Sequence, residues 1–129
     1  NHAVVCTDWA HIAVDETGAP ERALGTKLID LPSPDAKLLP EQLAELAHLQ
    51  GVQHHVQPGV VSITQATELG TVYTSDEIAA ICDQAHALGM LVHLDGARIA
   101  NATPKWFSRA LTCWITAAWV TLSAWPARE

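Results

Sequence analysis

The stretch VVSITQATELGTVYTSDEIAAICDQAHALGMLVHLDGAR, residues 60–98, decides the fold of this chain. Its first part, residues 60–66, is mostly apolar and β-branched, which is typical of a buried strand. Its last part contains MLVHLD, residues 90–95, which predicts a second strand that is apolar on both faces. Parallel strands covered by helices have this character, so both segments indicate an α/β sheet.

A helix is expected between these two strands. Thr74 and Glu77 have the spacing of a capping box, in which each side chain accepts a backbone N–H of the other residue. Apolar residues then recur every three or four positions, which predicts one buried helix face. They are Ile78, Ile81, Cys82, Ala85 and Leu88. Gly89 follows as a left-handed helix end. The segment therefore predicts a strand–helix–strand unit with parallel strands and a right-handed crossover.

Further elements are expected upstream. AVVCT, residues 3–7, indicates another strand, and LPEQLAELAHLQ, residues 39–50, indicates a helix with Pro40 at its first position and Gly51 after its end. Between them, residues 15–37 are interrupted by glycines and prolines. This stretch predicts loops with short strands, including a hairpin near TKLIDL. The whole pattern predicts an α/β fold, a mostly parallel sheet with flanking helices.

Composition and charge restrict the kind of protein. The chain has 129 residues, of which 49% are hydrophobic and 16% charged, which suits one compact domain. A net charge of −7 argues against nucleic-acid or anionic-membrane partners, because either needs a basic patch. No apolar run is long enough to span a membrane. Cys6, Cys82 and Cys113 lack a zinc spacing and are expected to be reduced thiols, which indicates a cytoplasmic location.

The DGAR sequence at residues 95–98 carries the candidate chemistry. Asp95 closes a strand, and ligands of open α/β sheets bind beyond the carboxyl ends of the strands. An aspartate there can hold a protonated ring nitrogen, and Arg98 can hold an anionic oxygen or a carboxylate. These are the needs of pyridoxal phosphate. The alternative is purely structural: Asp95 caps the next helix and Arg98 pairs with it on the surface.

Several sequence blocks share one resemblance. DGARIANA follows QPGVVSITQATELGTVYTSDEIAAI and HALGMLVHL, and WAHIAVDETGAPE and GTKLIDLPSPDAKLLPEQL precede them. In this order, over about residues 3–102, they resemble the threonine aldolase / aromatic amino acid β-eliminating lyase family. The resemblance implies that residues 1–102 form a partial cofactor domain, part of the large domain of a fold-type I pyridoxal-phosphate enzyme. Such enzymes are homodimers or homotetramers that cleave 3-hydroxy amino acids, for example threonine to glycine and acetaldehyde.

The resemblance also implies roles for single residues. Asp95 would bind the pyridine nitrogen, and Arg98 would contact the phenolic oxygen of the cofactor or the substrate carboxylate side. His11 would stack on the cofactor ring and assist proton transfer as the catalytic group. Glu16 matches an acidic position near the same site. Glu68, in QATE, stands where many members have a histidine after an ENT segment, so the substrate is open.

Other histidines are less informative. His93 shares a strand face with Asp95, so it is either a neighbour of the site or a histidine satisfied within the core, and we favour the core. His54 and His55 are adjacent in a loop without metal-ligand spacing around them, so no metal site is expected.

Two parts of the family's machinery are not in this sequence. The lysine that forms the Schiff base belongs to a GGTK-like segment beyond DGAR, and Lys27, Lys37 and Lys105 do not have that setting. The loop that binds the cofactor phosphate belongs upstream of His11. We therefore expect a family fragment that is inactive alone. The alternatives are a non-catalytic α/β module that binds an anion or partner near Asp95, or another pyridoxal-phosphate β-eliminating lyase.

Residues 103–129 form an unassigned tail, because the resemblance stops after Ala102. This segment holds four of the five tryptophans and a single acid, Glu129. One hypothesis is out-of-frame translation, and the alternative is a divergent C-terminal segment. Translating the underlying DNA in the other two frames tests the first hypothesis, which is wrong if neither frame restores a strand followed by a Gly-Thr-Lys segment.

Overall fold

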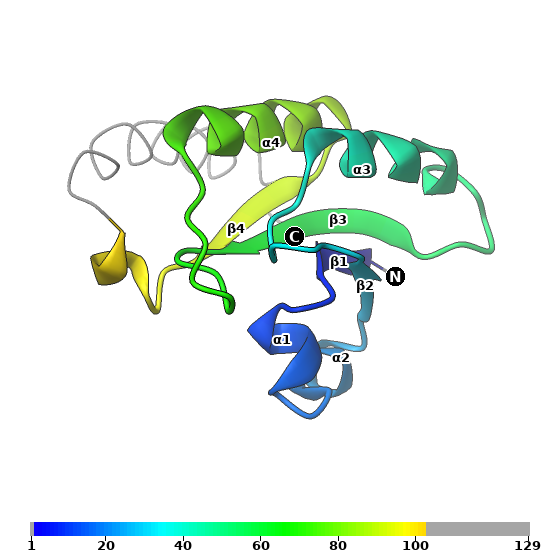
Figure 1. The fold of residues 1–129 in the computed structure, drawn as a ribbon. Helices are drawn as coiled ribbons and strands as arrows, with labels where there is room; N and C mark the ends of the chain where they lie inside the picture. Colours follow the sequence, from blue (N-terminus) through cyan, green and yellow to red (C-terminus); the bar gives the residue numbers. More distant parts are fainter. Residues whose placement is uncertain (1, 103–129) are drawn as a thin grey trace, which may run out of the picture.

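Four parallel strands form one sheet in this chain. The computed structural model describes residues 2–102, and within them the strand order is β2-β1-β3-β4 (Figure 1). The strands are β1 (His2–Thr7), β2 (Lys27–Leu31), β3 (Gln57–Thr64) and β4 (Leu91–Asp95). Each neighbouring pair is parallel, so the predicted class, an α/β fold with a parallel sheet, is confirmed. The predictions for residues 103–129 lie outside the described residues.

Helices lie on both sides of this sheet. In Figure 1, α3 and α4 lie above the strands, and α1 and α2 lie below them. The helices are α1 (His11–Val14), α2 (Ala19–Leu24), α3 (Pro40–Glu45) and α4 (Ser75–Ala87), with 3-10 turns η1 (Leu46–Leu49) and η2 (Ile99–Asn101). The expected helix at residues 39–50 is therefore α3 followed by η1.

The boundaries of α4 follow the expected cap chemistry. The Thr74 hydroxyl accepts the N–H of Glu77 at 3.2 Å, and the Glu77 carboxylate accepts the N–H of Thr74 at 2.6 Å. These bonds satisfy N–H groups that have no acceptor inside the helix. Gly89 has a φ of +71°, the left-handed conformation that ends the helix after Leu88. The strand–helix–strand unit is thus formed as predicted.

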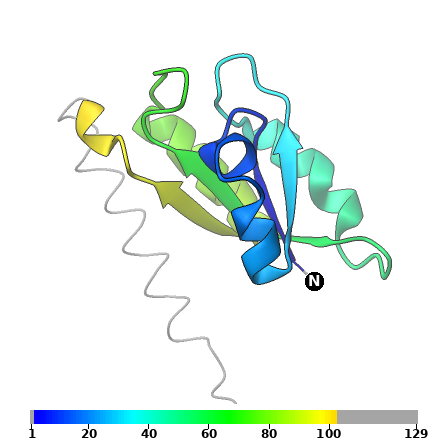
Figure 2. The ribbon, with the colours of Figure 1, turned by 90° about the horizontal axis from the view of Figure 1, so that it is seen from below.

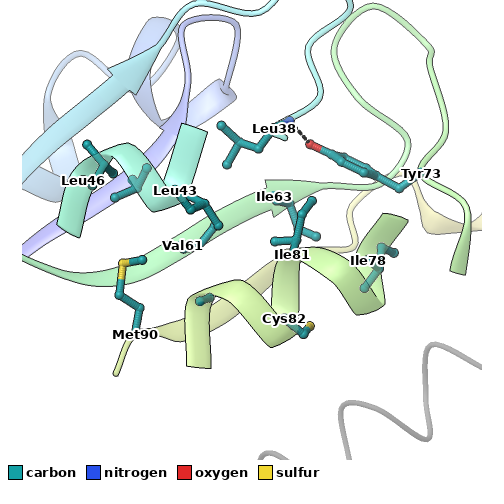
Figure 3. Packing of buried hydrophobic residues seen from close by; sticks show 12 residues of the cluster. Leu38, Leu43, Leu46, Val61, Ile63, Tyr73, Ile78, Ile81, Cys82 and Met90 are labelled. Atoms are coloured by element: carbon teal, nitrogen blue, oxygen red, sulfur yellow. Dashed lines mark hydrogen bonds between the residues drawn. The ribbon is translucent and has the colours of Figure 1, made fainter. Parts of the chain in front are cut away.

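The core lies between the sheet and the helices α3 and α4. Val5, Val61 and Val92 are register partners across three strands and point to this side. Leu43 and Met90 are among the buried side chains that pack with them in Figure 3. From α4 come Ile78, Ile81, Cys82 and Ala85, four of the five residues predicted for its buried face. Full burial of each large aliphatic side chain stabilises the fold by about 1.5–3 kcal/mol.

The loop between β3 and α4 is held by buried polar groups. The side chain of Gln65, which is fully buried, bonds to the backbone of Tyr73 in both directions, at 3.0 and 3.1 Å. The Tyr73 hydroxyl in turn accepts the N–H of Leu38 at 2.7 Å (Figure 3). The loop that carries Glu68 is therefore anchored to the core at both of its ends.

The hairpin expected near residues 26–31 is wrong. β2 pairs in parallel with β1, and the helix α2 lies in the connection between them. Parallel neighbours need a crossover, whereas a hairpin joins antiparallel strands. Pro20 in the first turn and Gly25 at the end, with a φ of +60°, are the helix signals that the loop interpretation of this region overlooked.

The second face of the sheet is covered unevenly. In Figure 2, which views the sheet from below, α1 and α2 lie in front of its middle, and no helix of the described residues lies in front of β4. Leu91 is 49% exposed, so the expectation that β4 is buried on both faces is wrong. His93 is also exposed, with its Nδ1 atom 3.0 Å from the Ser62 hydroxyl, so it is not the expected core histidine.

Within residues 2–102, no helix has the length and apolarity to cross a membrane.

Candidate active site

Three loops converge at the carboxyl edge of the sheet. β1, β3 and β4 end at Thr7, Thr64 and Asp95, and all three strands run in the same direction. The segments that follow them carry His11, Glu68 and Arg98, residues far apart in the sequence. Because parallel strands end at one edge, these side chains are brought to the same place.

Glu68 is the centre of this group. Its Oε1 atom lies 2.6 Å from Nη2 of Arg98 and accepts the backbone N–H of His11 at 3.3 Å. The side chain of Glu68 is only 14% exposed and that of Arg98 34%. Partial burial reduces screening by water, so this ion pair contributes more than a fully exposed one would.

Arg98 is held by a second contact from the same loop. Its Nε–H donates to the carbonyl oxygen of Ala66 at 2.9 Å. The structural alternative in which Arg98 pairs with Asp95 on the surface is therefore wrong, since the carboxylate partner of Arg98 is Glu68.

Asp95 is the last residue of β4, and one of its two carboxylate oxygens accepts a hydrogen bond. Its Oδ1 atom accepts the backbone N–H of Ala97 at 2.9 Å, which closes a local turn. Asp95 does not cap the next helix, as the structural alternative expected, because η2 begins after Arg98 and has no side-chain cap. Within residues 2–102, the other oxygen, Oδ2, has no hydrogen-bond partner. One oxygen thus orients the group, and the second remains available to a ligand.

His11 begins the short helix α1 and is close to Glu16. The Nδ1 atom of the imidazole lies 3.1 Å from Oε1 of Glu16, and the two side chains are 45% and 36% exposed. A hydrogen bond this exposed contributes little to stability. When Nδ1 donates its proton to this carboxylate, Nε2 is the acceptor of the neutral ring.

The remaining candidates lie elsewhere. His54 and His55 are exposed in the loop before β3, and among the described residues no group of His, Cys, Asp and Glu is arranged to hold a metal ion. Lys27 begins β2, at the amino edge of the sheet, and the ammonium group of Lys37 pairs with Glu77 at 2.5 Å. Neither lysine contacts His11, Glu68 or Arg98.

Part of the site has no sequence signal. The Ala66 carbonyl that binds Arg98 is a backbone group, and any residue could supply it. Glu68 did have a signal, because it interrupts the family pattern in QATE. Its partners could not be inferred, since they come from loops 57 residues before and 30 residues after it.

Comparisons with known proteins agree with one another. A family model described as beta-eliminating lyase matches residues 1–124. A low specificity L-threonine aldolase of a Pseudomonas species is 45% identical over 102 residues, which is 78% of this chain and 30% of that protein. The Pseudomonas aeruginosa protein of the same description is 43% identical over 102 residues. The chain thus spans about a third of the length of these curated relatives.

Solved structures extend the comparison to the fold. A threonine aldolase of Leishmania major superposes with a TM-score of 0.73 at 39% identity, over 77% of this chain and 29% of that one. A Listeria monocytogenes protein described as an L-allo-threonine aldolase gives a TM-score of 0.65 over 89% of this chain and 31% of that one. Its 20% identity supports the fold alone. In both of these proteins the matching region is about a third of the chain.

Proposed function

The chain belongs to the beta-eliminating lyase family, and from this premise we propose that it carries part of the active site of a pyridoxal-phosphate-dependent lyase. The proposed reaction is the cleavage of 3-hydroxy amino acids, such as threonine to glycine and acetaldehyde. One observation supports this proposal above all: His11, Glu68 and Arg98 meet at the carboxyl edge of a fold-type I sheet, beside Asp95. The 45% identity to a low specificity L-threonine aldolase favours the same reaction.

The donor set fits the proposed cofactor. Oδ2 of Asp95 is the oxygen that would face the pyridine nitrogen, because Oδ1 is already bonded to Ala97. A carboxylate at this point favours the protonated ring, and the bound cofactor supplies an electron-withdrawing heterocycle that stabilises charge at the substrate Cα. Arg98 would hold the phenolic oxygen of the cofactor or the carboxylate side of the substrate.

His11 is proposed to act as the base that accepts a proton from the substrate. Its exposed imidazole can cover the face of the ring, while Glu16 keeps the proton on Nδ1. Nε2 is then free to accept the proton of the substrate β-hydroxyl as the bond between Cα and Cβ breaks. Glu16 would thus orient His11 without touching the substrate.

The chain by itself is expected to release no glycine. Lys27, Lys37 and Lys105 lack the GGTK-like sequence setting of the family's Schiff-base lysine, so we expect none of them to form the Schiff base. The measurement is incubation of the 129-residue chain with pyridoxal phosphate and threonine, followed by amino acid analysis. Glycine above the level of a protein-free control would contradict this expectation.

A chimera tests the proposed function directly. Residues 3–102 would replace the aligned segment of the Pseudomonas low specificity L-threonine aldolase. From the family resemblance, the rest of that protein is expected to supply the Schiff-base lysine and the phosphate loop. We expect the chimera to release glycine from threonine. Asp95→Asn in the chimera should lower kcat at least about tenfold, because an amide cannot favour the protonated ring through its charge.

The outcomes of this experiment are distinct. A folded chimera that binds the cofactor and releases no glycine would contradict the proposed reaction. A soluble chimera that fails to bind the cofactor would favour the alternative of a non-catalytic module near Asp95. The description of the family model supports one second candidate, β-elimination, and the family resemblance suggests aromatic amino acids as its substrates. Pyruvate and ammonia released from tyrosine or tryptophan, in place of glycine from threonine, would support that candidate.

The substrate class and the assembly complete the proposal. The names of the relatives support an amino acid as the substrate. A homodimer or homotetramer is proposed from the family resemblance, and a cytoplasmic location from the buried, free thiol of Cys6. Sedimentation of the active chimera would determine the number of subunits.

A further inference from the structure

The donors of Arg98 are divided between the protein and solvent. A guanidinium has five N–H groups, and Nε–H and the nearer Nη2–H point to the same side. In this chain that side faces the loop after β3, where the Ala66 carbonyl and the Glu68 carboxylate accept at 2.9 and 2.6 Å. The N–H groups at the Nη1/Nη2 end of the side chain therefore remain available to a ligand.

Glu68 also links the start of α1 to the turn after β4. The same oxygen atom, Oε1, binds Arg98 and accepts the N–H of His11, so it holds these two residues near each other. The carboxylate is largely buried, whereas that of Glu16, the other acid beside His11, is much more exposed. Hydrogen bonds to a charged group are among the stronger ones, and they are stronger away from water.

We propose that Glu68 is a positioning residue that orients Arg98 so that only the Nη1/Nη2 end of its guanidinium meets an anionic oxygen of a ligand, and that holds His11 at a set distance from it. The pair of Glu68 and Arg98 carries no net charge, so ligand recognition depends on the direction of the remaining N–H groups. The identity of that ligand rests on the proposed function, whereas the geometry does not.

The experiment measures the side-chain N–H of Arg98 in the full 129-residue chain. In ¹⁵N-labelled protein, the Nε–H resonance is assigned by its loss in Arg98→Lys. We expect its exchange with water to be at least about tenfold slower than that of the exposed Arg22, as a charge-assisted clamp requires. In Glu68→Gln, exchange at Arg98 Nε–H and at the His11 amide should both become about tenfold faster.

Glu16→Gln is the matched control. Glu16 contacts the ring of His11 and does not contact Arg98, so this variant should leave the Arg98 resonance and its exchange unchanged. A general loosening of the site would instead change the Arg98 signal in both variants, which would overturn the specific role of Glu68.

Two results overturn the proposal. One is exchange at Arg98 as fast as at Arg22 in the unsubstituted chain, which needs no variant to fold. The other is unchanged exchange at Arg98 in a folded Glu68→Gln chain. Neither measurement uses cofactor or substrate, so an inactive chimera together with a protected Arg98 would reject the proposed function and leave the positioning role intact.

Discussion

Tyr73 illustrates how one buried polar group can join separate parts of the chain. Its side chain is 1% exposed, and its hydroxyl accepts the N–H of Leu38, a residue from the segment before α3. Burial is the main cause that raises the pKa of Tyr73 far above its ordinary value, so the phenol stays neutral. A buried N–H without an acceptor destabilises a fold by more than an average hydrogen bond stabilises it. Loss of the Tyr73 hydroxyl should therefore destabilise the fold.

Tyr73→Phe should lower the free energy of unfolding by about 1–3 kcal/mol, because the N–H of Leu38 loses its acceptor. Urea unfolding followed by circular dichroism measures the change. Val72→Ala, at the partly exposed neighbouring position, is the control and should change stability by less than about 0.5 kcal/mol. Equal midpoints for Tyr73→Phe and the unsubstituted chain would show that the bond contributes nothing.

Cys6 should be unreactive in the folded chain. Burial, followed by the negative charge of Asp30, raises the pKa of its thiol from 9.0 to about 12. At pH 8 the thiolate population is then about a thousandfold smaller than in the unfolded chain. Alkylation with iodoacetamide, followed by mass spectrometry of the Cys6 peptide, should be slow in buffer and fast in urea.

The raised pKa of the Cys6 thiol also makes the stability of the fold depend on pH. Between about pH 9 and pH 12 the folded thiol keeps its proton and the unfolded one loses it, so stability falls as the pH rises through this range. Cys6→Ala should reduce this part of the pH dependence. Rapid alkylation of Cys6 at pH 8 in the folded chain would contradict the burial of the thiol.

At the scale of the element, α4 connects two strands and supplies much of the core. Its start depends on Thr74, whose hydroxyl satisfies the N–H of Glu77. Glu77 has a second task, because it pairs with Lys37. This pair and the backbone bond at Thr74 lower the pKa of Glu77. The first turn of α4 is thereby tied to the segment before α3.

Thr74→Ala should destabilise the chain by about 1 kcal/mol through loss of the cap. Ser75→Ala, one residue later, is the matched control, because within residues 2–102 the Ser75 hydroxyl makes no hydrogen bond and alanine favours the helix interior. Thermal unfolding of both variants measures the difference. Similar losses in the two variants would mean that the cap is not the cause.

At the scale of the whole molecule, the sheet is unevenly covered. Val4, Leu28, Val60 and Leu91 are register neighbours and form an apolar row. Because strand residues alternate between faces, this row lies opposite the core residues Val5, Val61 and Val92, on the side where Figure 1 shows α1 and α2. Leu91, at one end of the row, is about half exposed. Exposed apolar rows on sheet faces and edges promote association.

The 129-residue chain should therefore associate as its concentration rises. Leu91→Lys should reduce this association, since a charge in the row opposes burial, whereas Leu24→Lys on α2, also at an exposed leucine, should not. Size-exclusion chromatography over a range of concentrations measures both effects. A monomer at every concentration would instead favour a self-contained non-catalytic module.

The sequence by itself determined several of the local elements and the edge at which the site lies. The period of the apolar residues and the Thr74–Glu77 box defined α4, and the position of Asp95 after an apolar run placed it at a strand end. These features depend on residues within one or two turns of one another, so they can be recognised without knowledge of the rest of the chain.

Only the tertiary structure decided which segments meet. In the structure, β2 is a parallel partner of β1 and does not form a hairpin, and His93 is exposed. The hydrogen-bond partners of Arg98 are Glu68 and Ala66. Strand pairing and side-chain partners depend on the burial and hydrogen bonding of the whole sheet. A local pattern carries no information on which distant loop will offer the acceptor, because the acceptor is often a backbone carbonyl that every residue has.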